Sequence, residues 1–441
     1  MYFVYSLATA LALLISSPWW MWRMLRSGKY RAGLSERLGR FPARLQFQAR
    51  RGPGIWIHAV SVGEVLAVGR LITELRELYP DHRIAISTTT EAGHKLARTR
   101  YGPENVFYFP IDLGFAIRPY LKGLRPELVV MAETEFWPNL LRLAKKMGAS
   151  VAVVNARISN RSLPGYRRWR VLLKHVLANV DLFLAQSEED QRRLVDIGAP
   201  AERVHVSGNL KFDVKPPPQS PIVGELKAAI ENCAAQPVLV FGSTVEGEET
   251  PLLAAFREIL RTFPQALLVL APRRPERFDE AELLVREAGL GGVRRSKWQP
   301  PQERAPVGDK KFKLSGSVLL LDTIGELAAV YSLATVALVG GSLAPRGGHN
   351  ILEPAQFGIP IVVGPHMENF RDIIGAFREH QAVLQLEETS AEGLARVLLD
   401  LLQDEANRRA LGTAALRVVR AQQGATGRTI EALKPFIGQA L

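Results

Sequence analysis

Short apolar runs alternate along most of this chain with longer stretches in which apolar residues recur at helical spacing. In the first half, the apolar runs cover residues 54–60, 83–90, 104–110, 127–133, 149–156, 180–187 and 203–209. The stretch 65–79 has the spacing of an amphipathic helix. Strands that alternate with helices in this way are typical of a parallel sheet covered by helices.

A proline-rich stretch, Lys215–Pro221, interrupts the alternation, which then begins again. The second half has apolar runs at 237–243, 266–272, 317–323, 335–341 and 360–365, helical spacing at 249–263 and 276–288, and only helical patterns from Ser390 onward. Proline disfavours helix interiors and central strands, so the stretch is interpreted as a linker. The pattern predicts an α/β protein with Rossmann-like domains at 52–215 and 222–404, a linker at 216–221, and a C-terminal helix at 405–441 that returns to the first domain.

The first 22 residues form a separate segment. Residues 2–22 carry no charge and are almost wholly apolar, which is about the length that a membrane-spanning helix needs. Trp19, Trp20 and Trp22 close the segment, and basic residues begin at Arg23. A cleaved signal peptide has its positive charge before the apolar run and small residues after it. The reversed order predicts an uncleaved transmembrane anchor at 1–22 and a basic juxtamembrane connector at 23–51, with the rest of the chain in the cytoplasm.

The charge and cysteine content exclude several classes of protein. The net charge is +12, but the first 51 residues contribute +8 of it. Basic residues next to an apolar segment suit anionic lipid headgroups. The chain has no zinc-finger spacing, RNA-binding aromatic motif or basic-region helix, so nucleic acid is a poor match. With Cys233 as its single cysteine, the chain cannot form an internal disulfide or a thiolate zinc site.

Charged residues follow several predicted strands of the first half. Glu64 lies just past the first strand, where a helix begins, and a carboxylate there suits either the helix dipole or a general base. Glu133 and Glu135 follow a later strand, Arg157 follows the next, and Lys211 follows the last strand before the linker. The carboxyl ends of parallel strands are where open α/β sheets bind ligands. We therefore expect a site in the cleft between the two domains.

The second half carries groups that suit a phosphorylated ligand. Ser243 and Thr244 end one strand, and Pro272 and Arg273 end another. A glycine-rich loop at 340–348 precedes a predicted helix, whose first turn can donate N–H groups to an anion. Residues Asn350, Ile351, Leu352 and Glu353 open that helix, and Glu353 is placed to accept from ribose hydroxyls. No D-x-D motif and no metal-ligand spacing occur, so we expect neither a metal ion nor a cofactor.

A basic and apolar stretch at 161–174 is a candidate for binding an anionic acceptor. It holds Arg167, Arg168 and Arg170 beside Trp169 and a run of aliphatic residues. These side chains could meet phosphates at a membrane surface. A solvated helix with one apolar face explains the same pattern almost as well.

Taken together, these segments resemble the Kdo (3-deoxy-D-manno-octulosonic acid) transferases of lipopolysaccharide synthesis. The similarity runs in order through YRAGLSERLGR, HAVSVGEV, AETEFWPNLL, NARIS, SGNLKFD, GSTVEGEE, PRRPERF, DTIGEL and GGHNILEP. It implies an inverting glycosyltransferase of the two-Rossmann-domain (GT-B) type at the inner membrane, held by a single-pass anchor. The implied reaction moves Kdo from CMP-Kdo to a lipid A precursor, with the first domain holding the acceptor and the second the donor.

The resemblance also implies roles for individual residues. Glu64 resembles the general base, and Lys211 with a carboxylate of Glu133 or Glu135 resembles the residues that assist the transition state. The CMP-Kdo site is implied at Ser243, Thr244, Pro272, Arg273, Gly325, Glu326, Leu327, Asn350, Ile351, Leu352 and Glu353. Arg157, Arg167, Arg168 and Arg170 are the candidates for the acceptor. Many relatives carry histidine where this chain has Val245 and Arg274.

Two other functions stay open from the residues. One is a GT-B transferase or epimerase that uses a UDP-sugar, although an epimerase has no need of a membrane anchor. The other is a non-catalytic, membrane-tethered protein that binds a nucleotide sugar, and such a protein would have no use for Glu64. The number of Kdo units added and the oligomeric state do not follow from the sequence.

Overall fold

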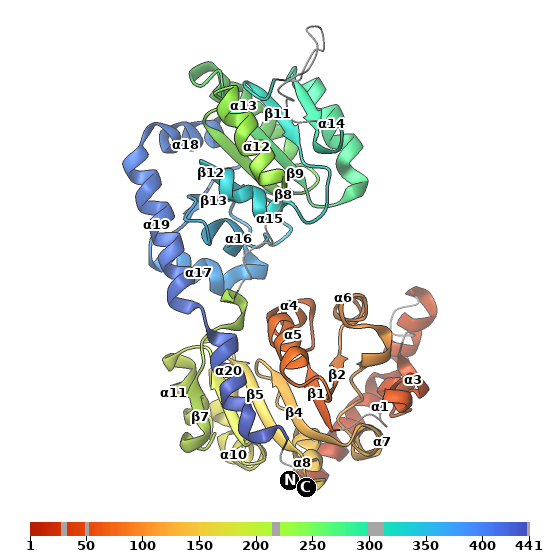
Figure 1. Cartoon of the computed structure of the whole chain (residues 1–441). Coiled ribbons are helices and arrows are strands. Elements are labelled where there is room, and N and C mark those ends of the chain that lie inside the picture. The colour runs from red at the N-terminus through yellow and green to blue at the C-terminus, as the bar shows by residue number, and fades with distance from the viewer. Residues whose placement is uncertain (28–32, 49–52, 214–220, 299–312, 439–441) are drawn as a thin grey trace. The chain divides into compact units, whose positions relative to one another are not determined.

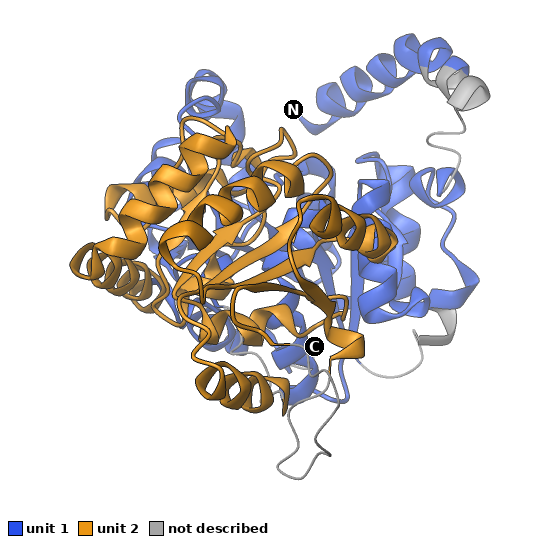
Figure 2. Ribbon diagram, turned by 90° about the horizontal axis from the view of Figure 1, so that it is seen from above, with its two compact units in different colours: residues 1–213, 422–441 blue, residues 214–421 orange. Residues whose placement is uncertain are grey.

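The computed structural model describes residues 1–27, 33–48, 53–213, 221–298 and 313–438 (Figure 1). The chain divides into two compact units (Figure 2). Unit 1 comprises Met1–Asp213 and Gln422–Leu441, and unit 2 comprises Val214–Ala421. The predicted linker, apart from Pro221, lies outside the described residues.

Unit 1 is built on a parallel sheet of seven strands in the order β3-β2-β1-β4-β5-β6-β7. The strands are β1 (Gly54–His58), β2 (Arg83–Thr88), β3 (Val106–Tyr108), β4 (Pro126–Ala132), β5 (Ser150–Ala156), β6 (Leu182–Ala185) and β7 (Val204–Val206). Successive strand residues point to opposite faces, so Ile55 and Ile57 enter one hydrophobic core while Trp56 enters the other. Both faces are therefore covered, as the apolar runs require.

Helices fill both layers of unit 1. They are α2 (Leu34–Arg37), α3 (Ala43–Gln48), α4 (Val62–Ala67), α5 (Gly69–Leu78), α6 (Glu91–Tyr101), α7 (Gly114–Leu124), α8 (Pro138–Lys146), α9 (Leu163–Arg168), α10 (Arg170–Leu177) and α11 (Glu188–Asp196), with short 3₁₀ helices η1 (Pro103–Asn105), η2 (Ala201–Arg203) and η3 (Leu210–Phe212). The helix predicted at 65–79 is two helices, α4 and α5, which meet at Val68.

Unit 2 repeats the architecture with a parallel sheet in the order β10-β11-β9-β8-β12-β13-β14. Its strands are β8 (Val238–Thr244), β9 (Leu267–Pro272), β10 (Gly292–Arg294), β11 (Ser317–Leu320), β12 (Val336–Val339), β13 (Ile361–Val363) and β14 (Leu384–Gln385). Its helices are α12 (Pro221–Asn232), α13 (Glu249–Thr262), α14 (Phe278–Glu287), α15 (Leu327–Val330), α16 (Leu352–Ala355), α17 (Arg371–Glu379), α18 (Ala391–Gln403) and most of α19 (Glu405–Gln422), with 3₁₀ helices η4 (Pro275–Arg277), η5 (Arg295–Lys297), η6 (Tyr331–Leu333) and η7 (Glu368–Phe370). The predicted pair of Rossmann-like folds is confirmed.

The C-terminal segment differs from the prediction. It is not one helix from 405, because α19 groups with unit 2 as far as Ala421. A second helix, α20 (Ala425–Leu433), and the 3₁₀ turn η8 (Lys434–Phe436) belong to unit 1 (Figure 1). Gly424, at φ 86°, separates the two helices in a left-handed conformation that glycine adopts without strain. Ile430 and Leu433 of α20 then enter a core of unit 1.

The N-terminal segment is a helix, α1 (Tyr2–Ser27). Its window Tyr2–Trp19 is long and apolar enough to cross a membrane by length and composition, and no part of that window is buried. The predicted boundary at residue 22 therefore falls inside a longer helix. Helices α2 and α3 occupy part of the predicted connector. Glu36 of α2 holds this part to unit 1, since its carboxylate accepts from the backbone N–H of Tyr108 at 2.9 Å and from Arg44 at 2.6 Å.

Candidate active site

In unit 1, the chain leaves β1 in one direction along the sheet and returns to β4 on the other side. Strands β1 and β4 are neighbours, so the loops after their carboxyl ends open at the point where an α/β sheet binds its ligand. Glu64 follows β1, and Glu133 follows β4 directly. The two predicted acidic segments thus meet at the carboxyl-terminal side of the sheet.

Glu64 closes the first turn of α4. Ser61 is the N-cap residue, and its hydroxyl accepts from the Glu64 backbone N–H. The Glu64 carboxylate accepts in turn from the Val60 backbone N–H at 2.7 Å and from the Ser61 hydroxyl at 3.1 Å. The arrangement resembles a capping box, except that the carboxylate accepts from the residue before the N-cap, so Glu64 does have a local role at the start of the helix.

The same carboxylate has the properties of a base. Its side chain is buried, and this desolvation raises its pKa from 4.5 to about 7, with the charges of Glu133 and Glu135 acting in the same direction. One of its oxygens accepts from Val60 and the other from Ser61, and a carboxylate oxygen has a second lone pair. Glu64 can therefore cap the helix and still accept a proton from a ligand near neutral pH.

Of the other two carboxylates, Glu133 lies in an ion pair and Glu135 lies in the same partly buried loop. Lys211, in η3, contacts Glu133 at 3.0 Å between its Nζ and the carboxylate oxygen, and both side chains are about three-quarters covered. Burial, followed by the charge of Glu133, raises the pKa of Glu135. Residues that lie 78 positions apart in the sequence thus share one site, and Glu135 keeps its proton to higher pH than an exposed carboxyl group.

Backbone strain marks the same loops. Glu133 has φ 56° and Asn155 has φ 54°, a left-handed conformation that is uncommon outside glycine. Such conformations cost free energy and cluster at functional sites. The side-chain amide oxygen (Oδ1) of Asn155 accepts from the backbone N–H of Leu210 at 2.9 Å, beside Lys211. Asn155 was not selected from the sequence, although an asparagine at a strand end tolerates this conformation better than most residues.

The C-terminal helix holds the loop that carries Lys211. The carboxylate of Asp213 accepts from the backbone N–H of Gly424 at 2.6 Å and from that of Thr426, at the start of α20. The Arg428 guanidinium donates to the Ser207 carbonyl at 2.8 Å. Both ends of the Ser207–Asp213 loop are therefore fixed by the same helix.

The candidate acceptor arginines do not form one cluster with the carboxylates. Arg167, Arg168 and Arg170 are exposed on α9 and α10, and Arg167 pairs with Asp196 at 2.5 Å. Arg157 lies nearer the segment Glu133–Trp137, here called the acidic loop. Its backbone carbonyl accepts from the Thr134 hydroxyl of that loop at 2.7 Å. Of these four residues, Arg157 is the one that the fold brings beside the Glu133–Glu135 segment.

Unit 2 has an equivalent point between β8 and β12. Ser243, at the end of β8, has φ 58° and so shares the strained conformation of Glu133. Thr244 is fully buried, and its hydroxyl donates to Glu249 at 2.9 Å. Glu249 also pairs with Arg277 at 3.1 Å. Thr244 therefore fixes the loop from inside, and its side chain does not face a ligand.

Glu248 joins the loop after β8 to the loop after β12. This residue was not selected from the sequence. Its buried carboxylate accepts from four backbone N–H groups: Val245 at 2.9 Å, Gly341 at 2.8 Å, Leu343 at 2.8 Å and Ala344 at 3.2 Å. The loops approach so closely that a Cβ on Gly340 would lie 2.6 Å from the Ser243 carbonyl oxygen. The signal available in the sequence was the position of Glu248 in the segment GSTVEGEE, directly after a predicted strand.

Around these loops lie the other predicted donor residues. Arg273 is exposed at the end of β9, and its backbone N–H donates to the Thr244 carbonyl at 2.9 Å. Its charge acts on Glu353, whose pKa is raised mainly by burial, and Asn350 donates to Glu353 at 3.3 Å. Ile351 and Leu352 have buried side chains, so only their backbone could meet a ligand.

The predicted turn at Gly325–Leu327 leads into helix α15 of unit 2. Gly325 has φ 95°, and Glu326 lies 3.6 Å from the Arg295 guanidinium. Leu327 packs against a core of unit 2. Of the two positions where relatives often carry histidine, Val245 contributes a backbone N–H to Glu248 and Arg274 is exposed.

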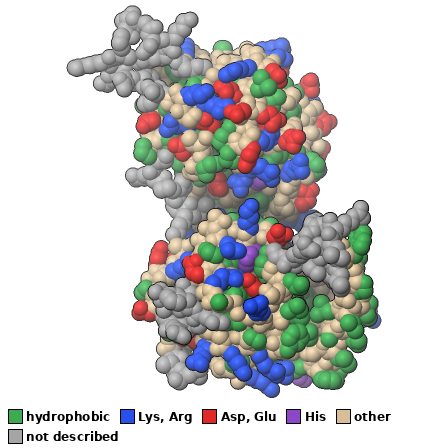
Figure 3. Space-filling model, turned by 90° about the vertical axis from the view of Figure 1, so that its right-hand side faces the viewer, with side chains coloured by type: hydrophobic (Ala, Val, Ile, Leu, Met, Phe, Trp, Pro, Cys, Tyr) green, Lys and Arg blue, Asp and Glu red, His purple; other side chains and the backbone are tan. Residues whose placement is uncertain are grey.

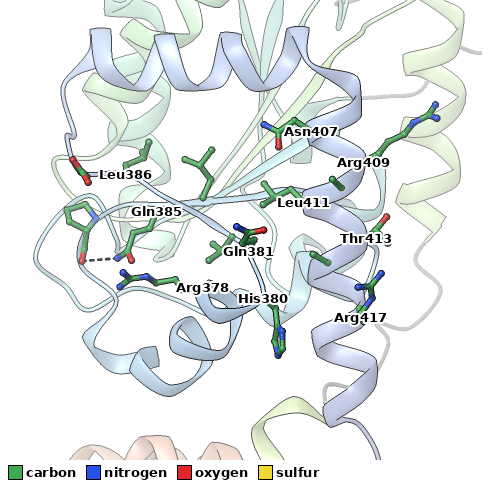
Figure 4. A pocket seen from close by; sticks show the side chains of 16 residues that line it. Arg378, His380, Gln381, Gln385, Leu386, Asn407, Arg409, Leu411, Thr413 and Arg417 are labelled. Carbon is green, nitrogen blue, oxygen red and sulfur yellow. Dashed lines mark hydrogen bonds between the residues drawn. The ribbon is translucent and has the colours of Figure 1, made fainter.

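A groove on unit 2 lies away from these residues. A groove of about 1130 Å³ runs between α17, β14 and α19, lined by side chains that include Arg378, His380, Arg409 and Arg417 (Figure 4). None of the predicted donor residues lines it. Within the described part of the chain, no three His, Cys, Asp or Glu side chains are grouped to hold a metal ion.

Comparisons with known proteins identify the family. Residues 32–214 match the family model of 3-deoxy-D-manno-octulosonic-acid transferase (kdotransferase). The chain is 36% identical over 431 residues to 3-deoxy-D-manno-octulosonic acid transferase of Bordetella pertussis, covering 95% of this chain and 96% of that protein. It is 33% identical to the enzyme of the same name from Haemophilus influenzae, covering 94% and 93%. UDP-GlcNAc 2-epimerase of Neisseria meningitidis, 11% identical over 87% of this chain and 100% of the epimerase chain, with a TM-score of 0.51, shares the fold. The chain belongs to the 3-deoxy-D-manno-octulosonic acid transferase family and is a glycosyltransferase of the GT-B fold.

Proposed function

We propose that this enzyme transfers Kdo from CMP-Kdo to a hydroxyl group of a lipid A precursor, with inversion at the anomeric carbon and without a metal ion. The observation that carries the proposal is the Glu64 carboxylate, which is buried at the carboxyl end of β1 with a pKa of about 7. Family membership supplies the sugar that is transferred. The proposed site is on the cytoplasmic face of the inner membrane, because the basic residues follow the apolar segment.

In the proposed reaction, Glu64 takes the proton of the acceptor hydroxyl while that oxygen forms a bond to the anomeric carbon. The bond between the anomeric carbon and the phosphate oxygen of CMP breaks, and CMP leaves with the bonding electrons. Attack on the face opposite the leaving group inverts the configuration. Because CMP is a good leaving group, the reaction needs no general acid.

Positive charge develops on the sugar ring as the bond to CMP breaks. We assign Glu133 and Glu135 to stabilise that charge, since both follow the strand next to β1. Lys211 pairs with Glu133 and keeps one of the three neighbouring carboxylates compensated in the resting enzyme. Arg273 and the loops joined by Glu248 are the groups of unit 2 that suit the phosphate of CMP.

The test is transfer by the purified full-length protein. CMP-Kdo and a tetraacylated lipid A precursor are incubated with the enzyme in excess EDTA, and mass spectrometry follows the acceptor. We expect the acceptor to gain the mass of Kdo and CMP to be released. Transfer that is lost in EDTA and restored by magnesium or manganese would contradict the metal-independent mechanism. Turnover of a UDP-sugar in place of CMP-Kdo would contradict the assignment of CMP-Kdo as the donor.

A further inference from the structure

The side chains of α1 divide into two faces. Among the first fifteen residues, those partly covered are Tyr2, Tyr5, Ser6 and Thr9, and the others are exposed. This spacing places the four on one side of the helix. The remaining surface is apolar and open: Phe3, Val4, Leu7, Leu11, Leu14 and Ile15 are all substantially exposed. A narrow stripe of hydroxyl-bearing side chains, the polar stripe, is therefore partly covered, and the rest of this part of the helix is apolar and open.

The polar stripe is bound to unit 1. The Asn139 amide of α8 donates to the Ser6 hydroxyl at 3.0 Å, and the Asn179 amide donates to the Tyr2 hydroxyl at 2.8 Å. The Tyr2 hydroxyl donates to the His175 carbonyl at 3.1 Å. The Arg142 guanidinium lies 4.5 Å from the centre of the Tyr2 ring. The first two turns of α1 thus lie along α8 and the end of α10.

A buried carboxylate extends this contact to the acidic loop. Tyr5 hydrogen-bonds to Asp112, which is almost fully buried. The Asp112 carboxylate accepts from the backbone N–H groups of Asn139 at 2.9 Å and Leu140 at 2.8 Å, at the start of α8. Helix α8 begins immediately after the Glu133–Trp137 segment. The start of α1 therefore lies against the element that ends the acidic loop.

These contacts conflict with a helix that crosses the bilayer. If α1 spanned the membrane and kept its contacts, Asp112, Asn139, Arg142 and Asn179 would lie at the depth of the hydrocarbon, where polar and charged groups are costly. If α1 spanned the membrane without them, its first turns would separate from unit 1. A helix that lies in the plane of the membrane keeps every contact and still turns its apolar face toward lipid.

The neighbouring surface suits the same orientation. Trp169, between α9 and α10, and Val171 and Leu172 on α10 are exposed. The same helix α10 carries the His175 carbonyl that accepts from Tyr2. Arg168, Arg170 and Lys174 are exposed on the same two helices. On the face of the molecule in Figure 3, hydrophobic side chains gather at the lower right and basic side chains line the lower edge. Apolar side chains flanked by basic ones are the composition of a surface that enters the headgroup region of an anionic leaflet.

We propose that α1 lies in the plane of the cytoplasmic leaflet, held to unit 1 through Tyr2, Tyr5 and Ser6, and that it forms one lipid-binding surface with α9 and α10. This orientation replaces the membrane-crossing helix that the sequence pattern predicts. It also holds the acidic loop, through Asp112 and α8, at a fixed distance from the surface that carries the lipid acceptor.

Cross-linking in native membranes tests the contact. In a Cys233→Ala background, Ser6→Cys and Asn139→Cys are introduced together, and inverted inner-membrane vesicles are treated with a short bismaleimide. We expect a Ser6–Asn139 cross-link by mass spectrometry of the digested protein. The control pair, Leu14→Cys with Asn139→Cys, places its first cysteine on the open face and should give none. A Ser6–Asn139 cross-link that forms in detergent and is absent from membranes would overturn the proposal.

The side of the membrane on which the chain begins gives a second test, which does not depend on enzyme activity. A single cysteine is placed before Met1 in the Cys233→Ala background, and an impermeant maleimide is applied to spheroplasts and to inverted vesicles. An in-plane helix leaves this cysteine on the cytoplasmic side, so we expect labelling in inverted vesicles alone. Labelling in spheroplasts alone would mean that α1 crosses the membrane, and the proposal would fail.

Discussion

At the carboxyl end of β1, one carboxylate closes a helix and is also the group that we assign as the base. The contacts that resemble a capping box account for the position of Glu64, and burial accounts for its pKa of about 7. A residue whose purpose was to cap α4 alone would be more stable in solvent with an ordinary pKa, since burial disfavours its charged form. The burial of Glu64 is the feature that capping leaves unexplained.

Glu64→Gln separates the two roles. Glutamine keeps the size of the side chain and can still accept from the Val60 N–H, so the fold should be retained. It cannot accept a proton, so we expect turnover to fall by about 10²–10⁴-fold, the range for loss of a general base. Steady-state kinetics of Kdo transfer measures this, with Glu77→Gln, an exposed residue on α5, as the matched control. A Glu64→Gln enzyme with the turnover of the parent would show that capping is its whole role.

The pH dependence of the reaction follows from the same carboxylate. Because the pKa of Glu64 is raised to about 7, the group is largely protonated below that pH and cannot act as a base. We expect kcat/KM to rise about tenfold per pH unit below about pH 7 and to level off above it. A kcat/KM that stays constant between about pH 5 and about pH 8 would contradict the assignment, whatever the effect of the Gln variant.

Glu248 is a positioning residue for the donor loops. Glu248→Gln leaves one carbonyl oxygen and an NH₂ group where a carboxylate accepted four N–H groups, so at least one N–H loses its acceptor. We expect the KM for CMP-Kdo to rise about tenfold, kcat at saturating donor to change by less than about threefold, and stability to fall by about 1–3 kcal/mol. Glu246→Gln, two residues away and exposed, is the control. A loss confined to kcat would place Glu248 in the chemical step instead.

At the scale of elements, α20 follows all of unit 2 in the sequence but belongs to unit 1, which carries the residues that we assign to the chemical step. Asp213 and Arg428 bind the loop that carries Lys211 to the start of this helix. We expect Asp213→Ala to lower kcat about tenfold by misplacing Lys211, and to cost about 1–2 kcal/mol of stability through the uncapped helix. The KM for CMP-Kdo should not change. Kinetics and thermal unfolding measure both effects, and Glu431→Ala on the outside of α20 is the control. A raised KM for CMP-Kdo with unchanged kcat would contradict the role of Asp213 in positioning Lys211.

The sequence located elements better than it located contacts. Strands buried on both faces have continuous apolar runs, so twelve runs were placed correctly, but β10 and β14 have only three and two residues at sheet edges and leave no such pattern. From the strand ends, the sequence places Glu64, Glu133 and Lys211 on the same, carboxyl-terminal side of the sheet. Their pairing, and the contact of Glu248 with residues 341–344, depend on the topology that joins distant segments. The left-handed backbone of Asn155 follows from tertiary contacts and has no pattern in sequence.

For the molecule as a whole, the two units carry separate parts of the proposed reaction. The predicted donor residues are in unit 2, and Glu64, Glu133, Glu135 and Lys211 are in unit 1. We expect changes in different units to have independent effects on the transition-state free energy, which should add within about 0.5 kcal/mol. The division can be measured, because donor binding and turnover are separate quantities.

Glu353→Ala and Glu64→Gln should therefore affect opposite quantities. Removing the Glu353 carboxylate takes away a buried acceptor beside Asn350 and Arg273, so we expect the Kd for CMP to rise about tenfold or more, with a smaller change in kcat. Glu64→Gln should leave that Kd unchanged and reduce turnover. Calorimetric titration with CMP, beside steady-state kinetics, distinguishes them, with Glu287→Ala on the exposed end of α14 as the control in unit 2. If Glu64→Gln weakened CMP binding as much as Glu353→Ala does, the nucleotide would depend on unit 1, and the donor site assigned here to unit 2 would be incomplete.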